Sequence, residues 1–195
     1  MSMTSPPPSL RRRLRDARRE LDEPAQAAAA DAVAVRLTPV VQASPPTVAG
    51  YIAADGEVRI DGVLDALREG GSTIVLPRMD SEEMTFHVVG SDDDLVPGEW
   101  GLTEPHEDTP VMPAEAIDVV LTPLVGFDRA CNRIGRGRGY YDRHFSFLND
   151  VPRPPRPRLI GIAHDLQLVE QLPVHAHDVR LDAVVTPTAL HGTLA

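Results

Sequence analysis

Residues 117–143 read IDVVLTPLVGFDRACNRIGRGRGYYDR and contain the passage from a strand to a helix. Residues 117–122 are apolar and rich in β-branched side chains, which predicts a strand buried in a sheet. A helix is predicted to begin at Tyr140 and to run to Leu148. A buried strand followed by a loop and a helix is typical of α/β proteins, so this stretch indicates the fold class.

The loop between this strand and this helix alternates glycine with arginine. It contains Arg133, Gly135, Arg136, Gly137, Arg138 and Gly139. Glycines remove the Cβ atoms that keep a backbone away from a bound group, and bare N–H groups beside guanidinium groups attract anions. The net charge of the chain is −10, so these cations stand out against an acidic background. The loop predicts a phosphate site, and the alternative interpretation is a flexible turn with surface arginines.

An acidic residue follows the loop directly. Asp142 is well placed to hold the Mg²⁺ of a nucleotide, because Mg²⁺ prefers oxygen ligands. The loop lacks the final Lys-Ser/Thr of a Walker sequence, and it is not a dinucleotide fingerprint at the end of a strand. The motif by itself therefore leaves the identity of the ligand open.

Length and composition limit the number of domains and the classes of function that the chain can have. The 195 residues are 42% hydrophobic, enough for one well-buried core, so we expect a disordered Pro/Ser-rich segment at residues 1–8 and a single domain at residues 9–195. The one cysteine, Cys131, excludes an internal disulfide and fits a reducing, cytoplasmic setting. No apolar run is long enough to span a membrane, and no signal peptide is recognised. The acidic balance argues against broad nucleic-acid binding.

Strands and helices alternate along the remaining sequence. Helices are expected at residues 10–21, 22–37 and 62–68, and strands at residues 47–53, 72–76, 84–89, 159–163 and 182–186. An acidic loop is expected at residues 91–98 and a stiff proline-rich connection at residues 151–158. This order predicts an α/β fold: a single-domain three-layer α/β/α sandwich with a mostly parallel sheet.

Residues 121–145, LTPLVGFDRACNRIGRGRGYYDRHF, resemble the signature of the 5-formyltetrahydrofolate cyclo-ligase family, also called methenyltetrahydrofolate synthetase. Further stretches resemble the family in the same order and at similar spacing. They are RRRLR (11–15), YIAADGEVRIDGVLDAL (51–67), LPRM (76–79), MTFH (84–87), WGLTEP (100–105) and HDVRLDAVVTP (177–187). The resemblance covers nearly the whole chain, and the combination is specific although each piece alone is weak.

This resemblance implies the α/β/α fold and an activity. The activity is the ATP- and Mg²⁺-dependent conversion of 5-formyltetrahydrofolate to 5,10-methenyltetrahydrofolate, with release of ADP and phosphate. The resemblance further implies that one continuous segment wraps the ATP phosphates, namely Arg133, Ile134, Gly135, Arg136, Gly137, Arg138, Gly139, Tyr140 and Tyr141. Arg11 and Arg15 would reach the nucleotide, and Asp142 and Asp178 would hold Mg²⁺.

The resemblance also implies contacts to a reduced folate, the small-molecule substrate. Ile52, Glu57 and the loop around Gly137 would touch it, and we expect Tyr140 beside it. The carboxylate of Glu57 suits the donors on the amino-pterin edge. Trp100 is either a core residue or a stacking surface for an aromatic ligand.

The implied reaction requires little covalent chemistry from the protein. Transfer of the γ-phosphoryl group to the formyl oxygen makes an imidate phosphate, and the neighbouring nitrogen then attacks the activated carbon while phosphate leaves. Such a reaction needs positioning and charge neutralisation. Arg136 and Arg138 are the predicted catalytic residues, with Arg136 stabilising the transferring group.

Some residues depart from the family pattern or have simpler interpretations. Arg11 stands where the family often has Lys, the register within RRRLR is ambiguous by one residue, and residues 130–132 replace a glycine-containing turn. The alternative interpretation of the arginines of residues 11–19 is a solvated helix face, and that of Glu57 is a loop charge. His175 and His177 beside Asp178 suggest a histidine metal cluster, the weaker interpretation.

Two other functions stay open at this point. One is a nucleotide-binding relative that acts on another N-formyl substrate. The other is an RNA-binding module that uses the Arg/Gly/Tyr loop, which the net charge of −10 disfavours.

Overall fold

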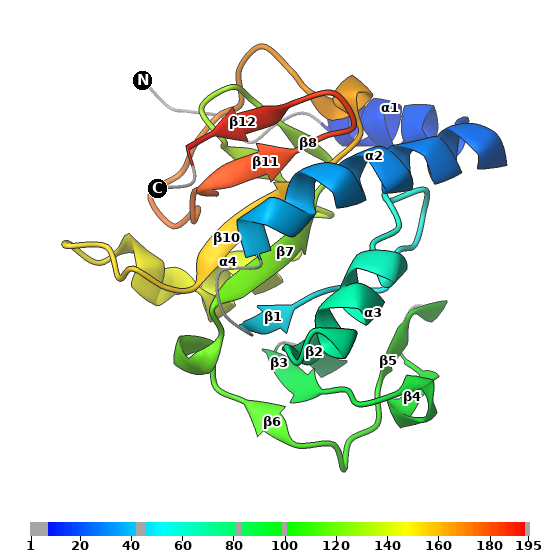
Figure 1. Ribbon diagram of the computed structural model, residues 1–195. Coiled ribbons are helices and arrows are strands. Elements are labelled where there is room, and N and C mark those ends of the chain that lie inside the picture. Colours follow the sequence, from blue (N-terminus) through cyan, green and yellow to red (C-terminus); the bar gives the residue numbers. More distant parts are fainter. Residues whose placement is uncertain (1–7, 42–45, 81–82, 99–100, 194–195) are drawn as a thin grey trace.

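The computed structural model describes residues 8–41, 46–80, 83–98 and 101–193. Its centre is an eight-stranded sheet (Figure 1). The strand order is β12 (Leu190–Gly192), β11 (Ala183–Val185), β10 (Arg158–Ile162), β7 (Val119–Pro123), β1 (Thr47–Ala49), β2 (Thr73–Asp80), β3 (Glu83–Val88) and β6 (Val111–Met112). Neighbouring strands from β11 to β2 are parallel, and β12, β3 and β6 join antiparallel at the edges. The expected α/β class with a mostly parallel sheet is confirmed.

Both faces of the sheet are covered, as three layers require. Side chains of a strand point alternately to opposite faces, and those of β7 obey this rule: Val119 and Leu121 join one core cluster and Val120 the other. Helices α2 (Glu23–Val41) and α3 (Asp61–Glu69) cover the first face (Figure 1). Helix α4 (Tyr140–His144) and the 3-10 helix Ser146–Asn149 pack into the second cluster.

Helix α1 (Pro8–Arg19) packs at the edge of this sandwich, beside a small hairpin. The hairpin pairs β8 (Gly126–Phe127) with β9 (Arg133–Ile134) and leads directly into the glycine loop. Leu14 of α1 shares a buried cluster with Ile134, and a Cβ at Gly126 would come within 2.6 Å of the Leu14 Cδ1 atom. Glycine at position 126 therefore allows α1 to lie close to the hairpin.

The turn of the β8–β9 hairpin, at residues 130–132, forms without a glycine. Cys131 adopts a left-handed backbone conformation, with φ 62°. The buried Asp128 carboxylate stabilises the turn, because its Oδ1 atom accepts hydrogen bonds from the backbone N–H groups of Ala130 and Asn132, both at 3.0 Å. The departure noted at residues 130–132 is thus compensated by one aspartate.

Several predicted boundaries are wrong. The strand expected at residues 47–53 ends at Ala49, since the chain then leaves the sheet. The second helix continues past residue 37 to Val41 although Pro39 lies inside it, since a proline in the last turn removes only one late hydrogen bond. The helix expected from Tyr140 to Leu148 ends at His144 and is followed by a 3-10 turn.

Short elements were not predicted at all. They are β6, β8, β9 and β12, the hairpin of β4 (Leu95–Pro97) with β5 (Thr103–Pro105), and the 3-10 helices Asp92–Asp94, Ala114–Ala116 and Asp165–Gln167. Two- or three-residue strands carry no readable periodicity. The disorder expected for residues 1–8 concerns a segment that, apart from Pro8 at the start of α1, lies outside the described residues. None of the described helices has the length and apolar character needed to cross a membrane.

Candidate active site

One cavity of about 790 Å³ collects nearly all the residues expected at the site. It lies where the chain leaves the carboxyl ends of β1 and β7, between which the direction of sheet growth reverses. Such a reversal leaves a crevice between neighbouring loops, where ligands of α/β sheets commonly bind. The predicted residues that line the cavity are Arg11, Ile52, Glu57, Asp142, Asp178 and the whole segment 133–141. Arg15 is not among the lining residues, and Trp100 lies outside the described residues.

The glycine loop reaches the cavity through unusual backbone conformations. Gly137 has φ 102° and Gly139, the residue before α4, has φ 67°, a region that residues with a Cβ rarely adopt. A Cβ at Gly137 would meet no atom within 4 Å, so conformation and not crowding requires glycine. Because α4 has only five residues, the attraction for an anion must come from the loop N–H groups and the guanidinium groups more than from a helix dipole.

Arg136 of the loop is joined to Glu57, which also lines the cavity. Its Nη2 atom lies 3.1 Å from Glu57 Oε1. The same carboxylate oxygen accepts from Arg18 Nη2 at 3.3 Å, and Glu57 Oε2 accepts from the Ala54 N–H at 3.2 Å. The Glu57 side chain is only 9% exposed. The residue expected at the phosphates and the residue expected at the folate therefore touch each other.

Arg133 has a different environment from the other loop arginines. Its side chain is 6% exposed, and its guanidinium donates to the Val179 carbonyl and, at 2.6 Å, to Asp142 Oδ1. Burial lowers the pKa of Arg133 from its ordinary value, and the negative charge of Asp142 opposes that shift. An arginine stays protonated in spite of such a shift. Arg133 thus orients Asp142, a contact that the sequence did not reveal.

Asp142 and Asp178 lie on the same wall of the cavity. Asp142 Oδ1 also accepts from the Val179 N–H at 3.1 Å, and Asp178 Oδ2 accepts from the His175 N–H at 2.7 Å. These bonds hold one oxygen of each carboxylate. A Mg²⁺ ion commonly uses one or two carboxylates together with phosphate oxygens and waters, so this donor set fits Mg²⁺ bound to a nucleotide.

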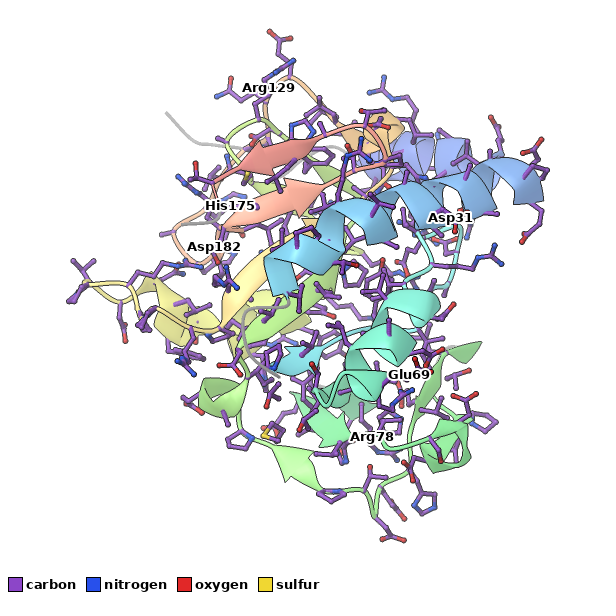
Figure 2. The ribbon with its side chains drawn as sticks, in the orientation of Figure 1. Asp31, Glu69, Arg78, Arg129, His175 and Asp182 are labelled. Atoms are coloured by element: carbon purple, nitrogen blue, oxygen red, sulfur yellow. The ribbon has the colours of Figure 1, made fainter. Side chains whose placement is uncertain are left out.

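A histidine metal cluster is not found. The rings of His175 and His177 stack 5.5 Å apart on the loop between β10 and β11, where Figure 2 labels His175. Within the described residues, no group of three or more His, Cys, Asp or Glu side chains is arranged to hold a metal ion. The oxygen pair of Asp142 and Asp178 remains as the candidate for a metal.

The arginines of α1 separate into different roles. Arg11 lines the cavity, and its Nε atom donates to the Gly135 carbonyl at 3.2 Å, which ties α1 to the glycine loop. Arg15 instead pairs with Asp55, with Nε 2.7 Å from Oδ2. Burial alone would raise the pKa of Asp55, but hydrogen bonds and charge from Arg15 and Arg18 lower it to about 2. Part of the basic face of α1 therefore forms ion pairs within the protein and is not a solvated surface.

Tyrosines form part of the cavity wall. Tyr140 and Tyr141 both line it, and the guanidinium carbon of Arg143 lies 5.1 Å from the centre of the Tyr140 ring. Burial raises the pKa of Tyr141 well above its ordinary value, so its hydroxyl stays protonated at neutral pH. The two rings offer flat surface and hydroxyl donors to a ligand.

Some residues of the site were not predicted from the sequence. Glu104 is 3% exposed and lines the cavity, and a Cβ at Gly98 would lie 2.4 Å from its carboxyl carbon. The apolar part of the wall includes Leu76, Met79 and Leu102. These residues belong to the stretches LPRM and WGLTEP, which resemble the family. The resemblance pointed to the stretches but did not single out individual side chains.

Comparisons with known proteins identify the family of the chain. The model of the 5-formyltetrahydrofolate cyclo-ligase family matches residues 4–187. The 5-formyltetrahydrofolate cyclo-ligase of Escherichia coli K12 is 36% identical over 154 residues, 77% of this chain and 81% of the relative. That of Mycolicibacterium smegmatis is 33% identical over 149 residues, 72% of this chain and 73% of the relative.

A solved structure agrees as well. The 5,10-methenyltetrahydrofolate synthetase of Aquifex aeolicus superposes with a TM-score of 0.80 at 26% identity, covering 94% of this chain and 91% of that one. The family model spans most of the chain, and the cavity contains the glycine loop of the family signature. The chain therefore belongs to the 5-formyltetrahydrofolate cyclo-ligase family, which makes it a ligase of folate one-carbon metabolism.

Proposed function

We propose that this protein uses ATP and Mg²⁺ to convert 5-formyltetrahydrofolate to 5,10-methenyltetrahydrofolate, releasing ADP and phosphate. One observation carries the proposal: a single cavity combines an arginine-glycine loop, two neighbouring carboxylates, and an apolar wall with a buried glutamate. Phosphates, a metal ion and a pterin each require one of these environments. The membership of the chain in the cyclo-ligase family supports the same reaction.

The nucleotide would bind on the side of the glycine loop. Arg11, Arg136 and Arg138 contribute positive charge there, and the backbone from Ile134 to Tyr141 contributes N–H groups. Asp142 and Asp178 would hold Mg²⁺, which when bound neutralises charge on the phosphates. Arg133 would keep Asp142 in place. Arg15 would act indirectly, through its ion pair with Asp55.

The reduced folate would bind on the opposite side. Ile52, Glu57 and Tyr140 line this part of the cavity together with the apolar residues of β2. The Glu57 carboxylate would accept hydrogen bonds from the amino group and ring N–H of the pterin. The loop around Gly137 lines the cavity and would contact the folate as well as the nucleotide.

The reaction needs two displacements. The formyl oxygen forms a bond to the γ-phosphorus of ATP, the bond to the bridging oxygen breaks, and ADP leaves. The second folate nitrogen then bonds to the formyl carbon and loses its proton, and the carbon–oxygen bond breaks with loss of phosphate. Arg136 and Arg138 would stabilise the charge on the transferring phosphoryl group.

A direct assay tests the proposal. Purified protein mixed with 5-formyltetrahydrofolate, ATP and Mg²⁺ should produce the near-ultraviolet absorbance of the methenyl product, and should release one phosphate for each product formed. Omission of ATP or addition of a chelator should abolish the signal. Absence of product from a protein that is folded by circular dichroism would refute the assignment.

The setting of the protein is part of the proposal. A single free and buried Cys131 suits a reducing, cytoplasmic compartment. We also propose that residues 9–195 form one domain. RNA is not a proposed ligand, because the net charge of the chain is −10 and the loop arginines line the same cavity as the Asp142 and Asp178 carboxylates.

A further inference from the structure

Arg18 of α1 is a fully buried arginine that the proposed chemistry does not use. Its relative exposure is 0%, whereas its neighbours Arg15 and Arg19 have side chains that are 36% and 50% exposed. Burying a guanidinium costs free energy unless hydrogen bonds and opposite charge compensate it. The partners of Arg18 therefore indicate what the buried charge does.

Two of these partners are backbone carbonyls of two different loops. Arg18 Nε donates to the Asp55 carbonyl at 2.7 Å, and Nη1 donates to the Leu124 carbonyl at 3.0 Å. Asp55 precedes Glu57 in the loop after β1. Leu124 follows β7 and leads into the β8–β9 hairpin, since the next residue, Val125, donates to the Ile134 carbonyl at 2.8 Å. One side chain thus ties the folate-side loop to the hairpin that carries the glycine loop.

The third nitrogen of the Arg18 guanidinium, Nη2, contacts two carboxylates. Nη2 lies 2.9 Å from Asp55 Oδ2 and 3.3 Å from Glu57 Oε1. Glu57 Oε1 also receives Arg136, whereas Arg15 and Arg19 pair with Asp55. Arg18 is thereby the α1 residue that reaches the carboxylate facing the ligand. Its three guanidinium nitrogens reach four acceptors in a fixed planar geometry, whereas a lysine has one nitrogen to offer.

We propose that Arg18 is a positioning residue for folate binding, which rests on the proposed function and adds a residue to it. Arg18 holds the Glu57 carboxylate in one orientation and fixes the backbone of residues 54–57 relative to Leu124. The pterin then meets a carboxylate that is already oriented, and little side-chain entropy is lost on binding. Arg18 makes none of its described hydrogen bonds or ion pairs with residues 133–141, so ATP binding is expected to depend less on it.

Arg18→Lys keeps the charge and removes the fork. We expect the KM for 5-formyltetrahydrofolate to rise about tenfold or more, since hydrogen bonds to a charged group are lost. The KM for ATP should change by less than about twofold, because no phosphate contact is touched. Arg19→Lys is the matched control: Arg19 also pairs with Asp55 but is half exposed, and we expect both KM values to stay near those of the unchanged protein.

A double-mutant cycle separates positioning from general support of the fold. If Arg18 acts through Glu57, then Arg18→Lys in a Glu57→Gln background should raise the KM for folate by less than about twofold. An equal rise in both backgrounds would mean that Arg18 acts elsewhere, and equal rises in both KM values would mean a structural role only. Either result overturns the inference.

Failure of the inference differs from failure of the proposed function. If the unchanged protein makes no methenyl product, the proposed reaction is wrong, and the inference built on it is rejected with it. If the unchanged protein is active and Arg18→Lys behaves like Arg19→Lys, only the inference is wrong. If neither Arg18→Lys nor Arg18→Gln gives folded protein by circular dichroism, Arg18 is a determinant of folding alone, and the inference is also rejected.

Discussion

Arg136 Nη2 lies 3.1 Å from Glu57 Oε1, so an ion pair crosses the cavity between the loop expected at the phosphates and the carboxylate expected at the pterin. Each ligand competes with this pair for one of its members. Phosphate would draw Arg136 away from Glu57, and the pterin would occupy Glu57. The two binding events would therefore be coupled through one contact.

This coupling predicts cooperative binding. Whichever ligand arrives first bears the cost of opening the pair, and the second ligand then binds more tightly. We expect a non-hydrolysable ATP analogue to bind several-fold more tightly when 5-formyltetrahydrofolate is present, on the order of 1 kcal/mol of coupling. Isothermal titration calorimetry with and without folate measures this. Equal dissociation constants under the two conditions would show that the ion pair does not couple the ligands.

Asp142→Asn should abolish turnover and also lower stability. The variant loses a proposed Mg²⁺ ligand, and it leaves the buried Arg133 without its counter-charge. Loss of that charged hydrogen bond should lower the free energy of unfolding by about 2 kcal/mol. Asp178→Asn is the matched comparison, because Asp178 is the other proposed Mg²⁺ ligand but accepts its short hydrogen bond from a backbone N–H.

The two aspartate variants are compared by urea unfolding and by turnover at several Mg²⁺ concentrations. We expect both to need more Mg²⁺ or to be inactive, and only Asp142→Asn to be clearly less stable. An active Asp142→Asn enzyme with an unchanged Mg²⁺ requirement would remove Asp142 from the metal site.

Gly137→Ala should destabilise the protein and weaken ATP binding. The residue has φ 102°, and a side chain strains that conformation by about 1 kcal/mol even though the added Cβ meets no atom within 4 Å. Gly135→Ala is a control for stability, since its Cβ also meets nothing and its backbone is not in that region. Thermal unfolding should give a lower melting temperature for Gly137→Ala only. Equal melting temperatures for both variants would contradict the conformational argument.

Acid should weaken the contact between α1 and the loop after β1. The pKa of Asp55 is lowered from 3.8 to about 2, so its ionised form contributes stability above pH 4, and that contribution is lost as the pH falls from about 4 to about 2. The shift corresponds to about 2 kcal/mol of unfolding free energy at neutral pH. Asp55→Asn should remove this part of the acid dependence in urea unfolding between pH 2 and pH 6. The exposed Asp65→Asn is a control that should leave the profile unchanged.

Local pattern was enough for the main features of the fold. The apolar, β-branched run around Val119 to Leu121 predicts a central strand, because a strand covered on both faces must be apolar at every position. The glycine-arginine alternation and the start of a helix at Tyr140 were also readable, since both depend on neighbouring residues. Lengths were less predictable: β1 ends at Ala49, opposite Val75 and Val120, although its partners β2 and β7 continue to Asp80 and Pro123. The chain leaves the sheet at that point, and the apolar run of residues 47–53 does not mark it.

The candidate site also has features that the sequence predicts and features that it does not. That residues 133–142 would meet an anion and a metal follows from their own composition. Three other features could not be predicted in this way: the ion pair of Arg133 with Asp142, the ion pair of Arg15 with Asp55, and the burial of Arg18. They depend on which distant groups share the same low-dielectric space.

The amino-acid sequence by itself determined the alternation of strands and helices, the glycine-arginine composition that predicts an anion site, and the resemblance to a family, because those properties belong to residues close together in the chain. Only the tertiary structure decided which arginines face the cavity and which neutralise buried carboxylates. Arg18 reaches Glu57 across 39 positions and the Leu124 carbonyl across 106, and no local pattern records a contact whose free energy depends on burial created by the whole fold.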